Sequence, residues 1–369
     1  MAMTPYGVAR CTAGSKSQRC CQLPSSFLIP NLRMSNRTKT IWLCSAVVAA
    51  LAALFLRAVW LQPASQVPGA FVAFDVSPVT DEIVFSAEDG DLYRLETTDR
   101  NLVQITKTAA VETAPSFSPD GRRVVYAREN AEGIGSSIYA QALDGSQLIR
   151  LTSTPDVCDS FPSFSADGSQ IVFARAGRHR PYSLGGMTWD NWDVWTVNSD
   201  GTDLRRLTDQ KYYELLTPHF TRDGARVIYS ANTPDAGTTS MLYAVGATDT
   251  RAPELLVKNG PAASFAERGS VPRPSRDGTR IAFLSDSVEH FHYDIVVMDP
   301  AGNSIQSARA TKVSKYNWAP VFSADGQFLV FLAGRELGPG NRPRLSLWRM
   351  GIDGTNPKRI ATHQELSHP

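Results

Sequence analysis

Cysteine is scarce in the part of the chain that can fold. Of the five cysteines, Cys11, Cys20 and Cys21 precede an apolar segment, Cys44 lies within it, and Cys158 alone remains. One thiol cannot form an internal disulfide, and no Cys-x-x-Cys pair or Cys/His cluster has the spacing of structural zinc. The fold must therefore be held by packing, and we expect Cys158 to be a small buried or half-buried residue.

Acidic residues are absent from the first 62 positions, which hold seven basic side chains. The rest of the chain carries 30 basic and 36 acidic residues, so it is mildly acidic. A surface that binds a phosphate backbone needs an excess of Lys and Arg. We therefore predict no nucleic-acid partner.

Catalytic signatures are also lacking. The sequence contains no G-x-S-x-G elbow, no H-E-x-x-H pair and no glycine-rich phosphate loop. These absences exclude a peptidase of recognisable form and a nucleotide site. We predict a non-enzymatic protein without a cofactor.

The sequence contains one long apolar run. Residues 41–56 carry no charge, and the run reaches residue 61 if the head group of Arg57 lies in the membrane interface. A spanning helix needs about 20 residues, and the basic residues before the run favour a cytoplasmic N-terminus. We predict a single-pass membrane protein with a basic cytoplasmic segment at 1–40, a signal anchor at 41–61, a linker at 62–69, and a periplasmic or extracellular remainder.

A cleaved signal peptide is the alternative for this segment. Cleavage needs small residues after the apolar run, whereas Pro63 stands where a small residue is wanted, so we favour the uncleaved anchor. Met34 opens a compact basic stretch, MSNRTKT, and we interpret it as an alternative start of the chain.

One motif recurs along the rest of the sequence. Its clearest copies are PSFSPDGRRVVY at 115–126, PSFSADGSQIVF at 162–173 and PVFSADGQFLVF at 320–331. Variant copies are PHFTRDGARVIY at 218–229, RPSRDGTRIAF at 273–283 and the degenerate FDVSPVTDEIVF at 74–85. The Asp-Gly pairs begin at 120, 167, 223, 277 and 325, at spacings of 47, 56, 54 and 48 residues. Such a period is typical of repeat architectures.

Each copy predicts a strand, a tight turn and a second strand. Asp bonds its own backbone in the turn, Gly accepts positive φ, and a β-branched and aromatic run follows. A third apolar run follows in every copy, and most copies then turn at a second Gly into a fourth run that ends in Leu151-Thr152, Leu207-Thr208 or Ile360-Ala361. Four antiparallel strands repeated six times predict an all-β, six-bladed β-propeller over 70–363, followed by a tail at 364–369. The blades are expected at 70–107, 112–153, 159–209, 215–258, 270–313 and 317–363.

The motif, with the I-Y/W-x-x-x-x-D-G and R-L-T segments that follow it, resembles the PD40 (WD40-like) propeller repeats of TolB and its relatives. The resemblance covers about residues 70–363. It implies a binding scaffold of the cell envelope with a protein, peptide or glycan partner, although such repeats also occur in peptidase propellers and lyases. TolB has an α/β domain ahead of its propeller, and this sequence has only the 62–69 linker there, so we do not carry over a Tol-Pal role.

The long second-to-third loops suggest where a partner binds. The Asp-Gly turns lie on one face and are short, whereas 176–191, 231–240, 286–293 and 333–344 vary in length on the other. Loops on a rigid frame often carry function. We predict binding at this second face, with Arg and aromatic candidates Arg178, His179, Arg180, Tyr182, Trp189, Trp192, Tyr212, Tyr213, Tyr316 and Trp318. The alternative for Trp189 and Trp192 is that they fold the loop back onto its own blade.

A metal site is the alternative to a pure scaffold. The His290-Phe-His292 pair resembles two metal ligands, and His219 is expected on an innermost strand. Oligogalacturonate lyases with related propellers hold manganese with several histidines. The alternative function is therefore a metal-dependent polysaccharide lyase with manganese or calcium in the central funnel.

Overall fold

A computed structural model describes residues 73–131, 134–181, 187–232, 240–248, 252–257, 269–286, 293–302, 305–307, 313–314, 316–337 and 343–367. All of them belong to one compact unit, Trp60–Pro369. In this described part, no helix is long and apolar enough to cross a membrane. The predicted segments 1–40, 41–61 and 62–69 lie outside the described residues.

The strands follow one another in the order of the chain. The first sheet contains β1 (Phe74–Val76), β2 (Ile83–Ser86), β3 (Leu92–Leu95) and β4 (Leu102–Gln104). An eight-stranded sheet contains β5 (Glu112–Phe117), β6 (Arg123–Glu129), β7 (Ser136–Ala142), β8 (Ile149–Arg150), β9 (Cys158–Phe164), β10 (Gln170–Pro181), β11 (Met187–Asn198) and β12 (Arg205–Arg206). The third sheet contains β13 (Glu214–Phe220), β14 (Arg226–Asn232), β15 (Met241–Gly246) and β16 (Glu254–Leu255). The fourth contains β17 (Gly269–Pro274), β18 (Ile281–Asp286), β19 (Tyr293–Met298) and β20 (Ile305–Ser307). The last contains β21 (Tyr316–Phe322), β22 (Phe328–Leu337), β23 (Pro343–Gly351) and β24 (Lys358–Ala361), and α3 (His363–Ser367) follows it.

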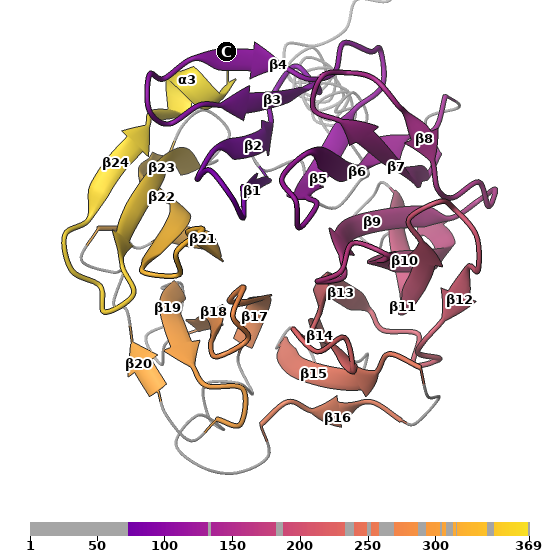
Figure 1. The fold of residues 1–369 in the computed structure, drawn as a ribbon. Coiled ribbons are helices and arrows are strands. Elements are labelled where there is room, and N and C mark those ends of the chain that lie inside the picture. The colour runs from indigo at the N-terminus through magenta and orange to yellow at the C-terminus, as the bar shows by residue number, and fades with distance from the viewer. Residues whose placement is uncertain are drawn as a thin grey trace, which may run out of the picture. The chain divides into compact units, whose positions relative to one another are not determined.

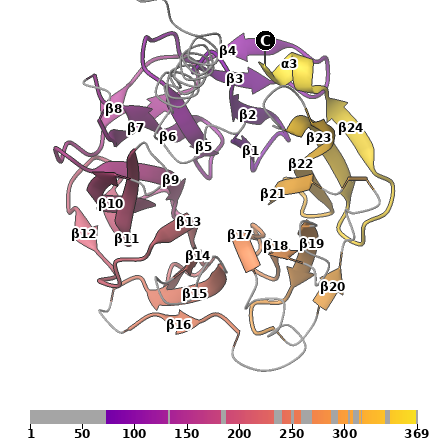
Figure 2. The same cartoon turned by 180° about the vertical axis from the view of Figure 1, so that it is seen from behind.

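These sheets make an all-β propeller with four-stranded antiparallel blades. The strands β1, β5, β9, β13, β17 and β21 lie nearest its centre (Figure 1), and Figure 2 shows the same order from behind. Within the eight-stranded sheet, β5–β8 and β9–β12 each pair antiparallel in chain order, and the two halves meet at a single parallel pair, Ser136 with Cys158. Cys158 is fully buried, and burial raises the pKa of its thiol to about 12. Its predicted role as a small buried residue is confirmed.

The Asp-Gly turns are held by local hydrogen bonds. Ser118 Oγ donates to Asp120 Oδ1 at 2.5 Å, the Arg122 amide donates to the same oxygen at 3.1 Å, and Gly121 has a φ of +70°. The hydroxyl bond from Ser118 is the main reason that the pKa of Asp120 lies below its ordinary value. Asp167, Asp223, Asp277 and Asp325 accept the same pair of bonds in their own turns. The structural role predicted for the turn aspartates is confirmed.

The Leu-Thr ends of the fourth strands connect neighbouring strands. Thr152 accepts a hydrogen bond from the amide of Ile138 at 2.9 Å and donates to Asp159 Oδ2 at 2.6 Å. Thr106 and Thr208 likewise accept from a third-strand amide and donate to a buried carboxylate. Buried polar groups need such partners because an unsatisfied one destabilises the fold. The repeated threonine therefore has a structural function.

A bulge interrupts the innermost strand of five repeats. At each bulge the strand register shifts by a residue, and one non-glycine residue takes a left-handed backbone conformation: Ala114 (φ 51°), Phe161 (52°), Thr217 (43°), Val271 (54°) and Ala319 (48°). The strand β1 of the degenerate first copy pairs with β2 without a shift. Bulges re-aim side chains and are common beside functional sites. Because the bulge recurs at the same place in five repeats, it sets the direction of the same side chains on each of these innermost strands.

The first and last sheets meet by side-chain packing. Strands β1–β4 come entirely from one end of the described chain and β21–β24 from the other, so neither sheet borrows a strand. Phe74 and Phe85 of the first sheet share a buried cluster with Leu332 and Leu347 of the last and with Leu366 of α3. Burying these apolar faces is the main stabilising contribution that ring closure can make here.

Polar contacts reinforce the same seam. The Ala324 amide donates to Asp81 Oδ1 at 2.7 Å, and Arg100 pairs with Glu365 of α3. Glu365 also accepts from the Thr362 amide at 2.7 Å, as in a capping box. The short helix α3, in the segment where the sequence predicts a tail, thus helps to join the two ends.

Two predicted loops are largely strand. β10 and β11 pair as far as Pro181 with Met187, and β22 and β23 as far as Leu337 with Pro343. The predictions of loops at 176–191 and 333–344 were therefore wrong over most of their length. Main-chain hydrogen bonds carry the ladder, so the polar and aromatic side chains that suggested a loop do not interrupt it.

Candidate binding site at the mouth of the central channel

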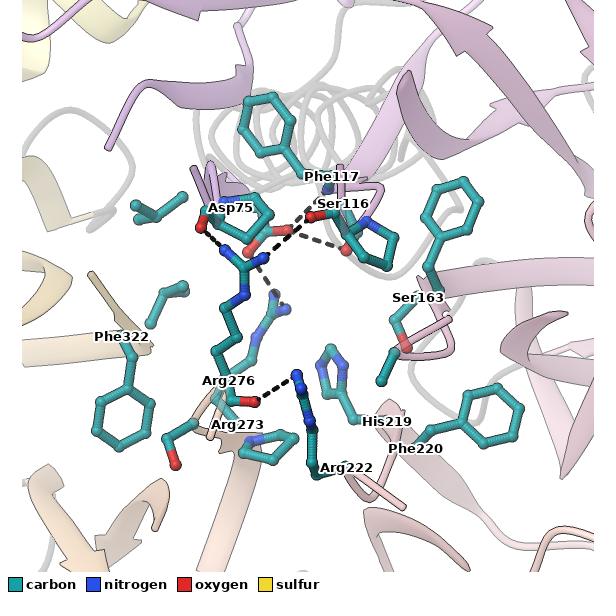
Figure 3. A pocket seen from close by; sticks show the side chains of 18 of the residues that line it. Asp75, Ser116, Phe117, Ser163, His219, Phe220, Arg222, Arg273, Arg276 and Phe322 are labelled. Atoms are coloured by element: carbon teal, nitrogen blue, oxygen red, sulfur yellow. Dashed lines mark hydrogen bonds and ion pairs between the residues drawn. The ribbon is translucent and has the colours of Figure 1, made fainter. Parts of the chain in front are cut away.

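A cavity of about 200 Å³ lies where the innermost strands converge. Its walls come from β1, β5, β9, β13, β17 and β21 and from the turns that follow them. Figure 3 shows Arg276 extending across the opening toward Asp75 and Ser116, while the rings of Phe117, Phe220 and Phe322 point away from it. Because the first-to-second turns line it, the cavity lies at the Asp-Gly face of the propeller. This is the face opposite to the one for which binding was predicted.

The second position of the repeated motif supplies one ring of wall residues. These side chains come from the same place in each copy but differ in chemistry: Asp75, Ser116, Ser163, His219, Arg273 and Val321. In five copies the residue two places earlier is the left-handed one of the bulge. The bulge therefore sets the direction of the channel residue.

The fifth position of the motif supplies a second ring, in the turns themselves. Its members are Pro78, Pro119, Ala166, Arg222, Arg276 and Ala324. Arg276 extends across the opening, where Nη1 donates to the carbonyl of Pro78 and Nη2 lies 3.5 Å from the carbonyl of Pro119 (Figure 3). Arg222 Nη1 donates to the carbonyl of Arg276 at 3.0 Å. Two arginines thus lie over the mouth, and the hydrogen-bond acceptors that they meet among the described residues are neutral carbonyls.

A third arginine lies deeper in the cavity. Arg273 Nη1 is 3.6 Å from Asp75 Oδ1, while Asp75 Oδ2 already accepts from Ser116 Oγ and from the Phe117 amide, each at 2.9 Å. Arg273 Nε is buried and has no hydrogen-bond partner among the described residues. Burial lowers the pKa of Arg273 from its ordinary value.

His219 faces the same cavity beside Arg273 (Figure 3). Burial, and then the charge of Arg273, hold the pKa of His219 well below its usual value. The imidazole is therefore neutral at pH 7. The site consists of three guanidinium groups, one carboxylate and a neutral imidazole, which suits an anion better than a cation.

The aromatic candidates of the predicted face are mostly buried. Trp189 and Trp192 are only 5% and 3% exposed and belong to a core cluster, so their side chains do not form a surface rim. Tyr212 is buried too, and its hydroxyl lies 2.9 Å from that of Tyr229. Trp318 is partly buried against two core clusters. For Trp189 and Trp192 the structure confirms the alternative that they fold back onto their own blade, because the extended β10–β11 hairpin carries them into the core cluster.

The other candidates are less informative. Tyr213 is 39% exposed, and Tyr316 belongs to β21 by its main chain. Arg178, His179 and Arg180 belong to β10 by their main chain, and Tyr182 lies outside the described residues. None of the ten predicted binding residues is among those that line the cavity. A binding role for these residues stays a prediction.

The metal candidates are not brought together in the described part of the chain. His219 lines the cavity, whereas His290 and His292 lie outside the described residues. Among the residues that are described, no group of three or more His, Cys, Asp and Glu side chains could hold a metal ion.

Arg222, Arg273, Arg276 and Asp75 are not among the binding residues predicted from the sequence. A signal for them was present in the aligned copies. The second and fifth motif positions change from copy to copy, and so do the eighth and ninth, which follow the Asp-Gly pair and do not line the cavity. Variation at a motif position is therefore a signal only when it is combined with the position of that residue on the innermost strand or in the turn that follows it.

Comparison with known proteins identifies the family. The family model described as the TolB beta propeller domain (PD40) matches residues 54–264, more than half of the chain. The chain belongs to this family. The TolB-like resemblance stated from the repeats is confirmed.

Individual relatives of the TolB propeller family are distant. The Tol-Pal system protein TolB of Francisella tularensis subsp. mediasiatica is 26% identical over 223 residues, which cover 59% of this chain and 46% of that protein. The chain thus matches about half the length of this curated relative. TolB of Acinetobacter baumannii has a similar structure, with a TM-score of 0.57, 20% identity, and coverage of 80% of this chain and 65% of that one. An oligogalacturonate lyase of Vibrio parahaemolyticus has a TM-score of 0.54, 14% identity, and coverage of 79% and 77%. These structural likenesses show the fold, which TolB proteins and enzymes share.

Proposed function

We propose that this chain is a non-enzymatic binding scaffold of the cell envelope that holds a protein partner at the Asp-Gly mouth of its central channel. One observation carries the proposal. On a frame whose Asp-Gly turn recurs in five copies, the two motif positions that line the cavity bring three arginines, one aspartate and one histidine to its mouth. The names of the TolB relatives support an envelope role. We propose the channel mouth as the partner-binding surface. Binding at the opposite face, where the sequence placed Arg178 and Trp192, stays a separate prediction.

The architecture that we propose has six blades and a membrane anchor. Four separate four-stranded sheets and the two antiparallel halves of the eight-stranded sheet support six blades. The uncharged run at 41–56 and the basic residues before it support a single-pass anchor with the propeller in the periplasm or outside the cell. Retention of the full chain in carbonate-washed membranes is the expected result, and release into the wash would contradict the anchor.

Site-specific crosslinking tests the location of the site. Ala166 is exposed and lines the cavity, whereas Ser146 is exposed in a third-to-fourth turn and does not. A photoreactive amino acid at position 166 of the full chain is expected to give a discrete, protease-sensitive adduct in native membranes. The same group at position 146 is the matched control. Equal adducts from both positions, or none from position 166, would refute binding at the mouth.

The lyase alternative is not favoured by the described residues. A divalent cation near His219 would meet the positive charges of Arg222, Arg273 and Arg276. Elemental analysis of the purified chain separates the two functions. We expect no stoichiometric manganese or calcium, and a bound metal that is lost in His219→Ala would favour the lyase.

A further inference from the structure

Positive charge gathers at the channel mouth of an otherwise acidic domain. The cavity is lined by Arg222, Arg273 and Arg276 and by one acidic residue, Asp75. The chain after residue 62 has more acidic than basic side chains, so this excess of arginine is local rather than general. A concave site lined by one sign of charge concentrates ligands of the opposite sign.

The hydrogen-bonding capacity of these arginines is only partly used. A guanidinium carries five N–H donors arranged to fit an oxyanion. Arg276 meets two neutral carbonyls, Arg222 meets one, and the contact of Arg273 with Asp75 is long at 3.6 Å. Arg273 Nε has no partner in the described structure. Hydrogen bonds from a guanidinium to a charged acceptor are stronger than those to a neutral one, so an oxyanion would displace the carbonyls of Pro78 and Pro119.

The size of the cavity limits the source of the oxyanion. About 200 Å³ is smaller than the 300–1,000 Å³ that is typical of sites for drug-sized ligands. It suits one side chain of a peptide better than a run of sugar units. A peptide also agrees with the protein partner proposed above.

We propose that the channel mouth binds an oxyanion carried by a peptide segment of the partner, either a carboxylate or a phosphoryl group. Arg276 exchanges its carbonyl contacts for the oxyanion, and Arg222 and Arg273 flank it. The inference rests on the proposed function for the identity of the partner as a protein. It adds the chemical group that the site selects.

Three labelled peptides test the charge preference on the detergent-solubilised full chain. They are Gly-Gly-Glu-Glu-Gly-Gly, its Gln counterpart and its phosphoserine counterpart, all amidated at the C-terminus so that the Gln peptide carries no carboxylate, and fluorescence anisotropy measures their binding. A charge-assisted pair at this site is expected to make the Glu or phosphoserine peptide bind at least about tenfold more tightly than the Gln peptide. The preference should weaken as salt is raised. The ratio between the two anionic peptides identifies the group, and equal binding of all three would overturn the proposal.

Variants separate recognition from folding. Arg276→Gln should abolish the preference for the anionic peptides, and Arg276→Lys should retain part of it. Ala166→Glu leaves every arginine in place and should also abolish it, because its own carboxylate competes for them. Arg122→Gln, in an exposed turn on the same face and outside the cavity, is the matched control and should change nothing. Unchanged preference in both Arg276→Gln and Ala166→Glu would overturn the proposal.

The crosslinking assay distinguishes failure of the oxyanion proposal from failure of the proposed function. If the position-166 adduct forms equally in the wild-type and Arg276→Gln backgrounds, the partner binds at the mouth without an oxyanion, and only this inference fails. If the wild-type background gives no adduct, the proposed function fails whatever the peptides do. Loss of the adduct in Arg276→Gln, with retention in Arg122→Gln, supports both.

Discussion

Arg175 donates to both carboxylate oxygens of Asp159, from Nε to Oδ1 at 2.6 Å and from Nη2 to Oδ2 at 2.8 Å. Both side chains are buried, at 5% and 1% exposure, and Arg175 also lies over the ring of Trp195. Thr152, which follows β8 in the other half of the eight-stranded sheet, donates a hydrogen bond to the same carboxylate. The ion pair lies within the β9–β12 half of the eight-stranded sheet, and the hydrogen bond from Thr152 connects it to the β5–β8 half.

Removal of Arg175 should destabilise the protein strongly. Arg175→Ala leaves the Asp159 carboxylate buried without its cation, and such a change costs about 3–5 kcal/mol. Chemical denaturation measures the free energy of unfolding. Arg205→Ala is the control because its ion pair with Asp203 is largely exposed, and it should cost at most about 1 kcal/mol. Equal effects of the two variants would contradict this account.

Relief of the backbone strain at Thr217, in the bulge of β13, should stabilise the protein. Thr217 is β-branched, has a φ of 43°, and buries a hydroxyl that has no partner in the described structure. Thr217→Gly removes the strain and the buried hydroxyl, and we expect a gain of about 1 kcal/mol in unfolding free energy after the entropy cost of glycine. Thr113→Gly is matched to it, because Thr113 is also buried with an unpartnered hydroxyl but lacks the positive φ. The control variant should lose stability. A loss of stability in both variants would contradict the proposal that the backbone at Thr217 is strained.

Truncation of Leu366 should weaken the closure of the ring. Leu366 is 1% exposed and packs against side chains of the first and last sheets. Leu366→Ala is expected to cost about 2–5 kcal/mol in denaturant unfolding. Leu148→Ala serves as the comparison, since Leu148 is 48% exposed, and it should shift stability by about 0.5 kcal/mol or less. A neutral Leu366→Ala would mean that α3 does not contribute to closure.

His219 should make stability depend on pH. Its pKa is lowered in the folded state, so the unfolded chain binds more protons once the pH falls below the unfolded value of about 6.5. Stability is then lost as the pH falls through that value. Arg222, Arg273, Arg276 and Asp75 are the charged groups around this cavity.

Comparison with His219→Gln isolates this effect from the other histidines. Between pH 7.5 and 5.5 the wild-type chain should lose about 1 kcal/mol more unfolding free energy than the variant. Urea denaturation at both pH values measures the difference. Parallel losses in the two proteins would show that the His219 pKa is not depressed.

Much of the frame could be predicted from particular residues. The Asp-Gly pairs predicted the turns, because their hydrogen bonds form within two or three residues of the aspartate. The third-strand segments containing Tyr139 and Trp195 also lie where the pattern placed them, in β7 and β11. The sequence left a choice open where the decision was not local. Trp189 and Trp192 could be exposed anchors or fold back onto their own blade, and the length of the β10–β11 ladder places them in a core cluster.

The sequence by itself determined the repeat, its turns, the four-stranded antiparallel blades and the family, because these depend on short-range backbone chemistry and on apolar alternation. Only the tertiary structure decided where a ligand can bind. Asp75 and Arg273 are separated by nearly 200 positions, and they come within 3.6 Å because the ring brings β1 and β17 to one axis. The direction of the Arg273 side chain depends on the bulge in β17, and the sequence of a single repeat does not determine the strand register that produces this bulge. The charge of the channel mouth is therefore a property of the closed ring.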